Sequence, residues 1–212
     1  MQWTLVIPLK PLALAKSRLA DTAADGLRPG LALAFAEDTV AAALASPAVR
    51  DVAVVTDDAL AGRTLAALGA RIVADEPRTG LNSALTHGAA AVRALRPDSA
   101  LAALNADLPA LRPAELARVL DAAAEFPRAF LADAAAIGTT LLTVAPGREL
   151  LPAFGTDSRA RHRASGAVEL LLDAVDSVRQ DVDTGEDLRT ALSLGVGPRT
   201  AAAAARLLIA EQ

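Results

Sequence analysis

The sequence WTLVIPLK, at residues 3–10, gives the first indication of the fold class of the chain. Its β-branched and large apolar residues follow one another with little polar interruption, which is typical of a strand that is buried on both faces. Three further short runs have a similar pattern: DVAVVT at 51–56, ARIVA at 70–74 and LAALN at 101–105. We therefore expect four strands of a parallel sheet in the first half of the chain.

Longer segments rich in alanine and leucine separate these strands. We expect helices at 29–46, 58–68, 82–96 and 113–125. Pro29, Asp57 and Pro113 stand where helix caps or first-turn prolines are favoured. Short strands that alternate with helices predict right-handed βαβ units. The expected fold class is therefore α/β, with a mostly parallel, twisted sheet flanked by helices.

The second half of the chain is less regular. We expect strands at 129–132 and 138–144, and then a polar, arginine-rich run, FGTDSRARHRASG, that leads into an apolar helix ending at Val175. Thr184 and Asp187 have the spacing of a capping box. A last strand and a C-terminal helix are expected at 177–182 and 198–211. No linker or repeat divides the sequence, so we expect one domain over residues 1–212.

The composition excludes several classes of protein. Hydrophobic residues make up 53% of the chain, but 53 of the 212 residues are alanine, and no run approaches the roughly 18 apolar residues of a spanning helix. The N-terminus lacks the layout of a secretory signal. There is no cysteine, and His87 and His162 are too few for a histidine-built metal centre. The net charge of -4 argues against nucleic-acid binding. We expect a soluble, cytoplasmic protein that binds neither nucleic acid nor membrane.

Cationic residues follow the first strand. Lys10, Lys16 and Arg18 stand directly after a buried strand, where they could hold the phosphates of a nucleotide. A solvated loop is the alternative interpretation. Neither the glycine-rich dinucleotide fingerprint nor the ordinary P-loop is present in this segment.

Acidic residues follow two other predicted strands. Asp107 comes at the end of an apolar strand, and alternation along the last predicted strand would put Asp181 and Asp183 on one face. Mg²⁺ prefers one or two carboxylates together with substrate phosphates, so these three residues are candidate magnesium ligands. The alternative is that they form turns or helix caps.

Small hydroxyl residues and glycines form a third group. Thr139 follows Gly138, and Gly155 and Ser158 lie in the arginine-rich run with Arg159, Arg161 and Arg163. Hydroxyls and backbone amides backed by arginines suit a small phosphorylated acid. A charged helix start is the alternative, and His162 is expected to pack or bond locally. Jointly, the three groups give the layout of a metal-dependent nucleotidyl transfer.

Six motifs resemble those of the 2-phospho-L-lactate guanylyltransferase family of coenzyme F-420 biosynthesis, particularly its actinobacterial members that use phosphoenolpyruvate. The resemblance covers nearly the whole chain. The motifs are IPLK at 7–10, AKSRL at 15–19, AD to GLN at 74–82, NADLPAL at 105–111, FGTDSRARHRASGA at 154–167 and DVDT at 181–184. The long FGTDSRARH run is the most specific, whereas ADLP is shared with many nucleotidyltransferases.

The resemblance implies a nucleotidyltransferase fold like that of the molybdenum-cofactor guanylyltransferases. The implied reaction is guanylyl transfer from GTP to a three-carbon phosphoacid, with release of pyrophosphate. The acid-binding residues of the family fall on Thr139 (or its neighbour Thr140), Gly155 and Ser158. The metal-binding acids fall on Asp107, Asp181 and Asp183, and Mg²⁺ is the expected ion.

Two details of this reaction can be predicted from the residues. A phosphate monoester is already ionised near neutral pH, its second pKa being about 6, so no general base is needed. Asn82 could contribute to guanine selection because its amide offers a donor and an acceptor together. A helix N-cap is the equally good interpretation of Asn82.

Other functions remain open. A nucleotidyltransferase for molybdopterin or a sugar phosphate would share Asp107 and the cations after the first strand, but would not need the 154–167 motif. A non-catalytic nucleotide-binding regulator is the alternative from a different class. The sequence does not separate phosphoenolpyruvate, 2-phospho-L-lactate and 3-phosphoglycerate as acceptors, and a homodimer through the C-terminal helix is possible.

Overall fold

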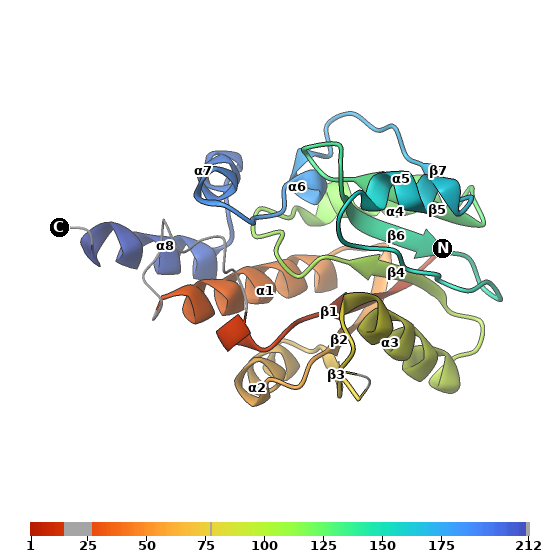
Figure 1. The fold of residues 1–212 in the computed structure, drawn as a ribbon, viewed down its shortest axis with the longest axis horizontal. Helices are drawn as coiled ribbons and strands as arrows, with labels where there is room; N and C mark the ends of the chain where they lie inside the picture. Colours follow the sequence, from red (N-terminus) through yellow and green to blue (C-terminus); the bar gives the residue numbers. More distant parts are fainter. Residues whose placement is uncertain (15–26, 77, 211–212) are drawn as a thin grey trace.

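The described residues form a seven-stranded sheet that runs through the molecule (Figure 1). The computed structural model describes residues 1–14, 27–76 and 78–210. The strands are β1 (Trp3–Pro8), β2 (Val49–Val55), β3 (Arg71–Val73), β4 (Ala100–Leu104), β5 (Arg128–Ala132), β6 (Thr139–Val144) and β7 (Val168–Glu169). Their order across the sheet is β3-β2-β1-β4-β6-β5-β7. Among these described strands only β6 runs against the others, so the sheet is mostly parallel, as predicted.

Helices cover both faces of this sheet (Figure 1). They are the 3-10 turn η1 (Leu12–Leu14), α1 (Arg28–Leu44), α2 (Ala59–Ala67), α3 (Leu81–Leu95), α4 (Pro113–Ala123), α5 (Ser158–Ala164), α6 (Asp176–Arg179), α7 (Gly185–Leu194) and α8 (Pro198–Ala210). Helices α1 and α4 pack on one face of β1 and β4, and α3 packs on the other. The result is three layers, helix on sheet on helix.

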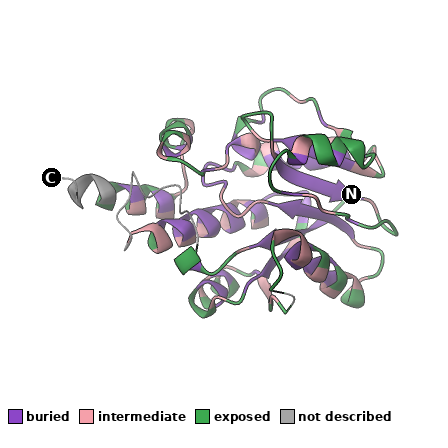
Figure 2. Ribbon diagram, viewed as in Figure 1, coloured by how far each residue is buried: buried purple, intermediate pink, exposed green. Residues whose placement is uncertain are grey.

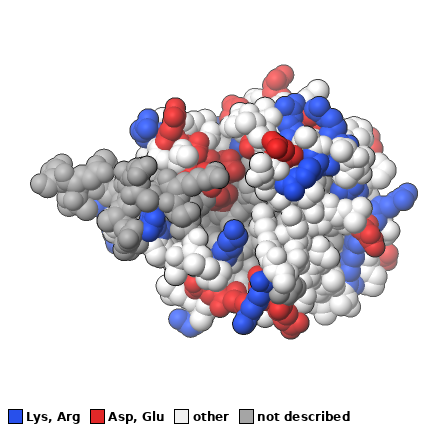
Figure 3. All heavy atoms as spheres, viewed as in Figure 1, with Lys and Arg blue, Asp and Glu red and all other residues white. Residues whose placement is uncertain are grey.

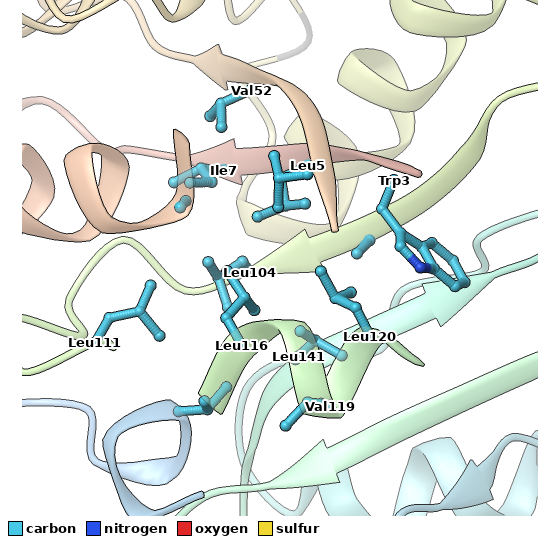
Figure 4. Packing of buried hydrophobic residues seen from close by; sticks show 14 of the residues in the cluster. Trp3, Leu5, Ile7, Val52, Leu104, Leu111, Leu116, Val119, Leu120 and Leu141 are labelled. Atoms are coloured by element: carbon cyan, nitrogen blue, oxygen red, sulfur yellow. The ribbon is translucent and has the colours of Figure 1, made fainter. Parts of the chain in front are cut away.

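The two faces of β1 explain why its sequence is continuously apolar. Trp3, Leu5 and Ile7 belong to the larger core, which also contains leucines of α4 such as Leu120, near Trp3 (Figure 4). Val6 points into the core on the opposite face, beneath α3. Every residue of β1 is buried, and the neighbouring strands are buried along most of their length (Figure 2). A strand covered on both faces needs apolar side chains at every position.

The predicted elements of the first half are confirmed to within a few residues at each end. One helix cap differs. Asp58, not Asp57, caps α2, because its Oδ1 accepts hydrogen bonds from the amides of Leu60 and Ala61. In the second half the capping box is confirmed, with Thr184 and Asp187 bonding each other's backbone amides at the start of α7.

Two predictions for the second half are wrong. The apolar run to Val175 is not a helix: α5 ends at Ala164, and after β7 the chain continues without regular structure. The guanidinium groups of Arg118 and Arg179 donate to backbone carbonyls of this run, at residues 170 and 172–174. These contacts supply the carbonyl partners that a helix would have supplied internally.

The strand predicted at 177–182 is also wrong, because residues 176–179 form the short helix α6. Glu115 on α4 holds its first turn, since Oε2 accepts from both the amide (3.0 Å) and the hydroxyl (2.7 Å) of Ser177. Val178 and Val182 are both buried at a spacing of four, which suits a turn of helix as well as it suits a strand.

The C-terminal helix α8 packs against α1 of the same chain (Figure 1). The buried carboxylate of Asp38, on α1, accepts hydrogen bonds from the amides of Arg199 (3.3 Å) and Thr200 (2.7 Å) at the start of α8. A methyl group on Gly197 would meet this carboxylate at 2.5 Å or less. Within the described ranges, no helix has both the length and the apolar character needed to cross a membrane.

Candidate functional site

A cavity of about 650 Å³ opens at the edge of the sheet where β1 and β4 end. Ligands of open α/β sheets bind at this edge, outside the carboxyl ends of the parallel strands. Strand β6 is reversed, so its first residues, not its last, lie beside the end of β4. The predicted site residues that line the cavity are Lys10, Asp107, Thr139, Gly155, Ser158, Asp181 and Asp183. Lys16 and Arg18 lie outside the described residues.

Lys10 enters the cavity directly after β1. Its side chain is exposed, and the backbone on either side is anchored to the first half of the sheet. The amide of Leu9 donates to the carbonyl of Val55 (2.9 Å), and the amide of Leu12 donates to Oδ2 of Asp58 (2.9 Å). Hydrogen bonds from backbone amides, that of Ala61 foremost, hold the pKa of Asp58 below its ordinary value. The Asp58 carboxylate therefore joins the start of α2 to the turn that follows Lys10.

Asp107 stands at the end of β4 on a rigid backbone. The amide of Asn105 donates to the carbonyl of Thr140 on β6 (3.0 Å), and the amide of Leu108 donates to the buried hydroxyl oxygen of Thr39 on α1 (3.0 Å). These two bonds hold the turn from both sides. The half-buried carboxylate of Asp107 is thereby held on the cavity wall.

Asp181 and Asp183 reach the same wall by a different route from the predicted one. The expected alternation along a strand is wrong, because the chain is irregular here. Instead, the amide of Val182 donates to the carbonyl of Asp107 (3.1 Å), and Asn105 Nδ2 contacts Asp181 Oδ2 (3.4 Å). One backbone bond and one side-chain contact therefore bring the two acidic segments together.

Thr139 is the first residue of β6 and is buried against the cavity. The tight turn before it is held by Asp133, whose carboxylate accepts from the amides of Ile137 (3.0 Å) and Gly138 (2.8 Å). A side chain on Gly138 would meet that carboxylate at 2.3 Å and would displace it from these two amides. Thr140 is fully buried and is not part of the cavity lining, so the structure favours Thr139 over Thr140 as the site residue.

Gly155 and Ser158 line the cavity from the loop that opens α5. Gly155 has φ +109°, a backbone conformation that L side chains rarely adopt. The amide of Ser158 donates to the carbonyl of Gly155 (3.1 Å), which closes the turn. Ser158 is the first residue of α5 and is almost fully buried. The Ser158 hydroxyl and the Gly155 backbone therefore share one wall of the cavity.

Asn82, on α3, bonds to a loop of the second half of the chain. The N-cap of α3 is Gly80, so the helix-cap interpretation is wrong. Asn82 Oδ1 accepts from the amide of Phe154 (2.8 Å), and its Nδ2 donates to the carbonyl of Phe154 (3.1 Å). The amide that was predicted to select guanine thus holds the loop before Gly155, and it is not part of the cavity lining.

The three arginines of α5, which were expected to back the hydroxyls and amides of the acid site, do not line the cavity themselves. Basic side chains gather on the surface over α5 (Figure 3), and none of the three is in the lining among the described residues. Arg159 and Arg163 pair with Glu169 on β7, and Arg161 donates to the carbonyl of Phe154. Burial raises the pKa of Glu169, but the hydrogen bonds from Arg163 and Arg159 outweigh it and bring that pKa below its ordinary value.

His162 occupies the centre of this region and is completely buried. Its Nε2 accepts from the amide of Ala153 (2.9 Å), and its Nδ1 lies 2.9 Å from the hydroxyl oxygen of Thr139. Burial, together with the positive charges of Arg128 and Arg161, lowers the pKa of His162 to about 4. The sequence predicted only a packed or locally bonded histidine, and did not predict the contact with a site residue.

A second cavity, of about 480 Å³, adjoins the first on the other side of Lys10. The two share the wall formed by residues 8–10, Leu14 and Leu81. The polar side chains of the second cavity are Asp57, Asp75 and Arg78, besides Lys10. Asp57 Oδ2 pairs with Arg78 Nε (2.6 Å), and Asp57 Oδ1 accepts from the amide of Asp75 (3.1 Å).

The charge of the first cavity bears on the predicted metal. Its described lining contains one cation, Lys10, and five carboxylates, at positions 107, 133, 157, 181 and 183. In the described ranges, no group of three or more His, Asp or Glu side chains is arranged to hold a metal ion by itself. Mg²⁺ in proteins is usually held by one or two carboxylates and completes its shell with waters and substrate phosphates.

Solved structures define the class of fold. A nucleotidyl transferase from Methanothermobacter thermautotroptrophicus (Mth528) matches with a TM-score of 0.61 and 24% identity, over 91% of this chain and 97% of that chain. Rv0371C in complex with manganese, from Mycobacterium tuberculosis H37Rv, matches with a TM-score of 0.55 and 21% identity, over 91% of this chain and 98% of that chain. The fold is therefore that of a nucleotidyltransferase.

Sequence comparison then defines the family. The family described as guanylyl transferase CofC like matches residues 3–204. The phosphoenolpyruvate guanylyltransferase of Streptomyces coelicolor (strain ATCC BAA-471 / A3(2) / M145) is 83% identical over 212 residues, which is 100% of both chains. This chain belongs to the guanylyl transferase CofC-like family, which confirms the resemblance found in the sequence.

Proposed function

We propose that this protein transfers the guanylyl group of GTP to phosphoenolpyruvate and releases pyrophosphate, as a step of coenzyme F-420 biosynthesis. The observation that carries the proposal is the 83% identity, over the whole of both chains, to a phosphoenolpyruvate guanylyltransferase. The two adjoining cavities support it, because the reaction needs space for two phosphorylated substrates that meet at one point. GTP and phosphoenolpyruvate are metabolites of the cytoplasm, and a cytoplasmic location therefore stays our prediction. The homodimer also stays a prediction.

The phosphoacid belongs, in this proposal, to the wall formed by Thr139, Gly155 and Ser158. Two hydroxyls and a glycine backbone offer hydrogen bonds to a carboxylate or a phosphate without adding a charge of their own. Gly155 lets the acid approach the backbone closely, as a side chain there would not.

The nucleotide belongs to the opposite side, with its triphosphate at Lys10 and its base in the second cavity. Lys10 lines both cavities, so one ammonium group can contact the phosphates that connect base and reacting centre. Lys16 and Arg18 stay predicted contacts to the same phosphates. The paired Asp57 and Arg78 would read guanine: a carboxylate accepts from its N2 amine, and a guanidinium donates to O6.

Two matched changes, one in the protein and one in the nucleotide, test the assignment of Asp57 to the guanine base. Asp57→Asn removes the carboxylate that would accept from the N2 amine of guanine, and inosine triphosphate lacks that amine. We expect the preference of the wild-type protein for GTP over ITP to fall by about tenfold in the variant, the equivalent of one lost hydrogen bond to a charged group. Asp75→Asn is the matched control in the same cavity. An unchanged preference in Asp57→Asn would remove Asp57 from the base site.

A divalent cation, Mg²⁺ by preference, is part of the proposal. Asp107 and Asp183 would hold it, with Asp181 as an auxiliary, and substrate oxygens would complete its shell. The excess of carboxylates in the cavity supports this, because two phosphorylated substrates would otherwise enter an acidic site. The manganese in the Rv0371C complex supports the use of a divalent ion by this fold. When bound, the ion would neutralise phosphate charge in the transition state.

Each site residue then has one role in the proposed reaction. The acceptor's phosphate oxygen attacks the α-phosphorus of GTP, a new P–O bond forms, and the bond to the β-phosphate oxygen breaks. The attacking oxygen is already ionised near neutral pH, so no residue has to remove a proton. Lys10 stabilises the charge that develops on the departing pyrophosphate. Thr139 and Ser158 hold the acid so that its phosphate points toward the nucleotide.

A pyrophosphate-release assay tests the function. The wild-type protein is given GTP and Mg²⁺ with phosphoenolpyruvate, 2-phospho-L-lactate or 3-phosphoglycerate, and a molybdopterin or sugar-phosphate acceptor serves as the comparison. We expect phosphoenolpyruvate to give the highest kcat/KM. If another three-carbon acid gave the highest kcat/KM, that acid would replace phosphoenolpyruvate as the proposed acceptor. Activity only with molybdopterin or a sugar phosphate, or GTP binding without release under any acceptor, would overturn the proposal.

A further inference from the structure

A buried histidine contacts the acceptor wall without being part of the cavity. The ring of His162 lies between the rings of Phe130 and Phe154, with centroids at 5.8 and 5.1 Å, and none of its surface is exposed. Both ring nitrogens nevertheless have polar partners. The chemistry of those partners decides which nitrogen carries the proton.

The backbone fixes the tautomer of this ring. The amide of Ala153 can only donate, so the Nε2 atom that lies 2.9 Å away must present its lone pair. A neutral imidazole with an unprotonated Nε2 carries its single proton on Nδ1. Burial and the charges of Arg128 and Arg161, which lower the pKa of His162 to about 4, support a ring with one proton at neutral pH.

The proton on Nδ1 in turn decides what Thr139 can do. Nδ1–H donates to the hydroxyl oxygen of Thr139 at 2.9 Å, so that hydroxyl accepts on its inner side. The hydroxyl hydrogen of Thr139 must therefore point away from His162. Because Thr139 lines the cavity, this hydrogen can be donated to a ligand there. A threonine hydroxyl in general can present either a hydrogen or a lone pair, and the histidine removes that choice.

We propose that His162 is a positioning residue that makes Thr139 an obligatory hydrogen-bond donor toward an anionic oxygen of the phosphoacid. The inference rests on the proposed function, because it takes the wall at Thr139 as the acceptor site. A donor held in this way suits a carboxylate or phosphate oxygen and disfavours a ligand that presents a hydrogen at this point. It also avoids the cost of orienting the hydroxyl when the acid binds.

The same ring holds the second part of the acceptor wall. Through Nε2 it fixes the backbone at Ala153, and Asn82 fixes the next residue, Phe154, by two hydrogen bonds. Gly155 follows directly. One imidazole therefore couples Thr139, on β6, to the loop that brings Gly155 and Ser158 to the cavity.

The two ring nitrogens can be tested separately with two amides. In His162→Asn the amide nitrogen lies near the Nδ1 position and retains a donor for Thr139. In His162→Gln the amide oxygen reaches toward the Nε2 position and retains an acceptor for Ala153. We expect His162→Gln to raise the KM for phosphoenolpyruvate about tenfold, and His162→Asn to raise it less, with the KM for GTP unchanged in both. An equal rise in both KM values in His162→Gln would overturn the inference.

A double-mutant cycle distinguishes positioning from a general structural role. Thr139→Val removes the hydroxyl on which His162 is proposed to act. If His162 acts through it, His162→Gln added to Thr139→Val should not raise the KM for phosphoenolpyruvate further. Effects that multiply would show that His162 acts by another route, and would overturn the inference.

A direct observation of the tautomer does not depend on activity or on any variant that fails to fold. The chain has only two histidines, so ¹⁵N spectra of the imidazoles can be assigned with a His87→Gln variant. We expect the His162 signals of a ring protonated on Nδ1 and unprotonated on Nε2. A proton on Nε2 overturns the inference and leaves the proposed function standing. Conversely, a wild-type protein that is inactive with every three-carbon acid overturns the function and leaves the tautomer standing.

Discussion

The two halves of the molecule build the site in different ways. In the first half, from β1 to α4, strands and helices alternate, and Lys10 and Asp107 stand where parallel strands end. In the second half, Thr139 begins a reversed strand, Gly155 lies in a left-handed turn, and Asp181 and Asp183 lie in an irregular segment. Side chains hold this half by hydrogen bonds to the backbone; they are those of Glu115, Asn82, Arg118, His162 and Arg179. In the proposed arrangement, the regular half supports the nucleotide and the irregular half supports the acceptor.

The largest expected effect on turnover concerns Asp107 and Asp183, the carboxylates that the two halves bring to one wall of the cavity. Asp107→Ala should leave a folded protein with turnover lower by at least about a hundredfold, since loss of one transition-state charge contact costs roughly 2.7–4 kcal/mol. Asp183→Ala, from the other half, should give a loss of the same order if both hold one ion. Asp121→Ala, an exposed aspartate on α4, is the control. Pyrophosphate release at saturating Mg²⁺ measures all three. A near-wild-type rate in Asp107→Ala would refute the metal assignment.

The next effect is a dependence of stability on pH, and it comes from His162, the buried histidine of the second half. The pKa of His162 is lowered from 6.5 to about 4 in the folded protein, chiefly by burial. Between those two values the unfolded chain binds the proton and the folded chain does not, so stability falls as the pH falls. We expect this residue to remove about 3 kcal/mol from the free energy of unfolding between pH 7 and pH 4.

Urea unfolding at the two pH values measures the effect. In His162→Gln the loss of stability on acidification should be smaller than in the wild type by that amount, whatever the stability of the variant at pH 7. Parallel curves for the wild type and His162→Gln would show that His162 is not buried in its neutral form.

The smallest effect separates backbone strain from contact with the acid. Gly155→Ala and Gly147→Ala both put a side chain on a residue with positive φ, at +109° and +72°. Each should lower stability by about 1–2 kcal/mol in thermal unfolding, since left-handed backbone costs that much for other residues. Only Gly155→Ala should also raise the KM for phosphoenolpyruvate, because Gly155 lines the cavity and Gly147 does not. A rise in KM in both variants would mean that strain in this half reaches the site from a distance.

The same contrast explains what could be predicted from sequence. Continuous apolar strands and alanine-rich helices specify the first half by their periodicity, so the position of Asp107 at a strand end followed directly. Asp181 and Asp183 were assigned to the correct wall for a wrong reason, because a buried pair at a spacing of four suits a helical turn or a strand equally well. Periodicity carries no information about a segment whose carbonyls are satisfied by arginines from other elements.

Contacts between distant residues were the other part that the sequence could not reveal. Asn82 and Phe154 are 72 positions apart, and Thr139 and His162 are 23 apart. Nothing in the local pattern around Asn82 distinguishes a residue that binds a loop from one that reads a base. For His162 there was one signal, a histidine among arginines next to a specific motif, which indicated a local role without identifying its partner.

The reversal of β6 has a consequence for how the specificity of this enzyme family can change. A strand that leads away from the catalytic edge leaves the bend before it, residues 133–138, at the mouth of the cavity, where exposed Ile137 is part of the lining. The backbone of that bend is bonded to Arg159 on α5 and Arg179 on α6, and none of its residues lines the second cavity. If the proposed sites are correct, we expect a change of acid to require changes in these six residues and to leave the choice of nucleotide intact.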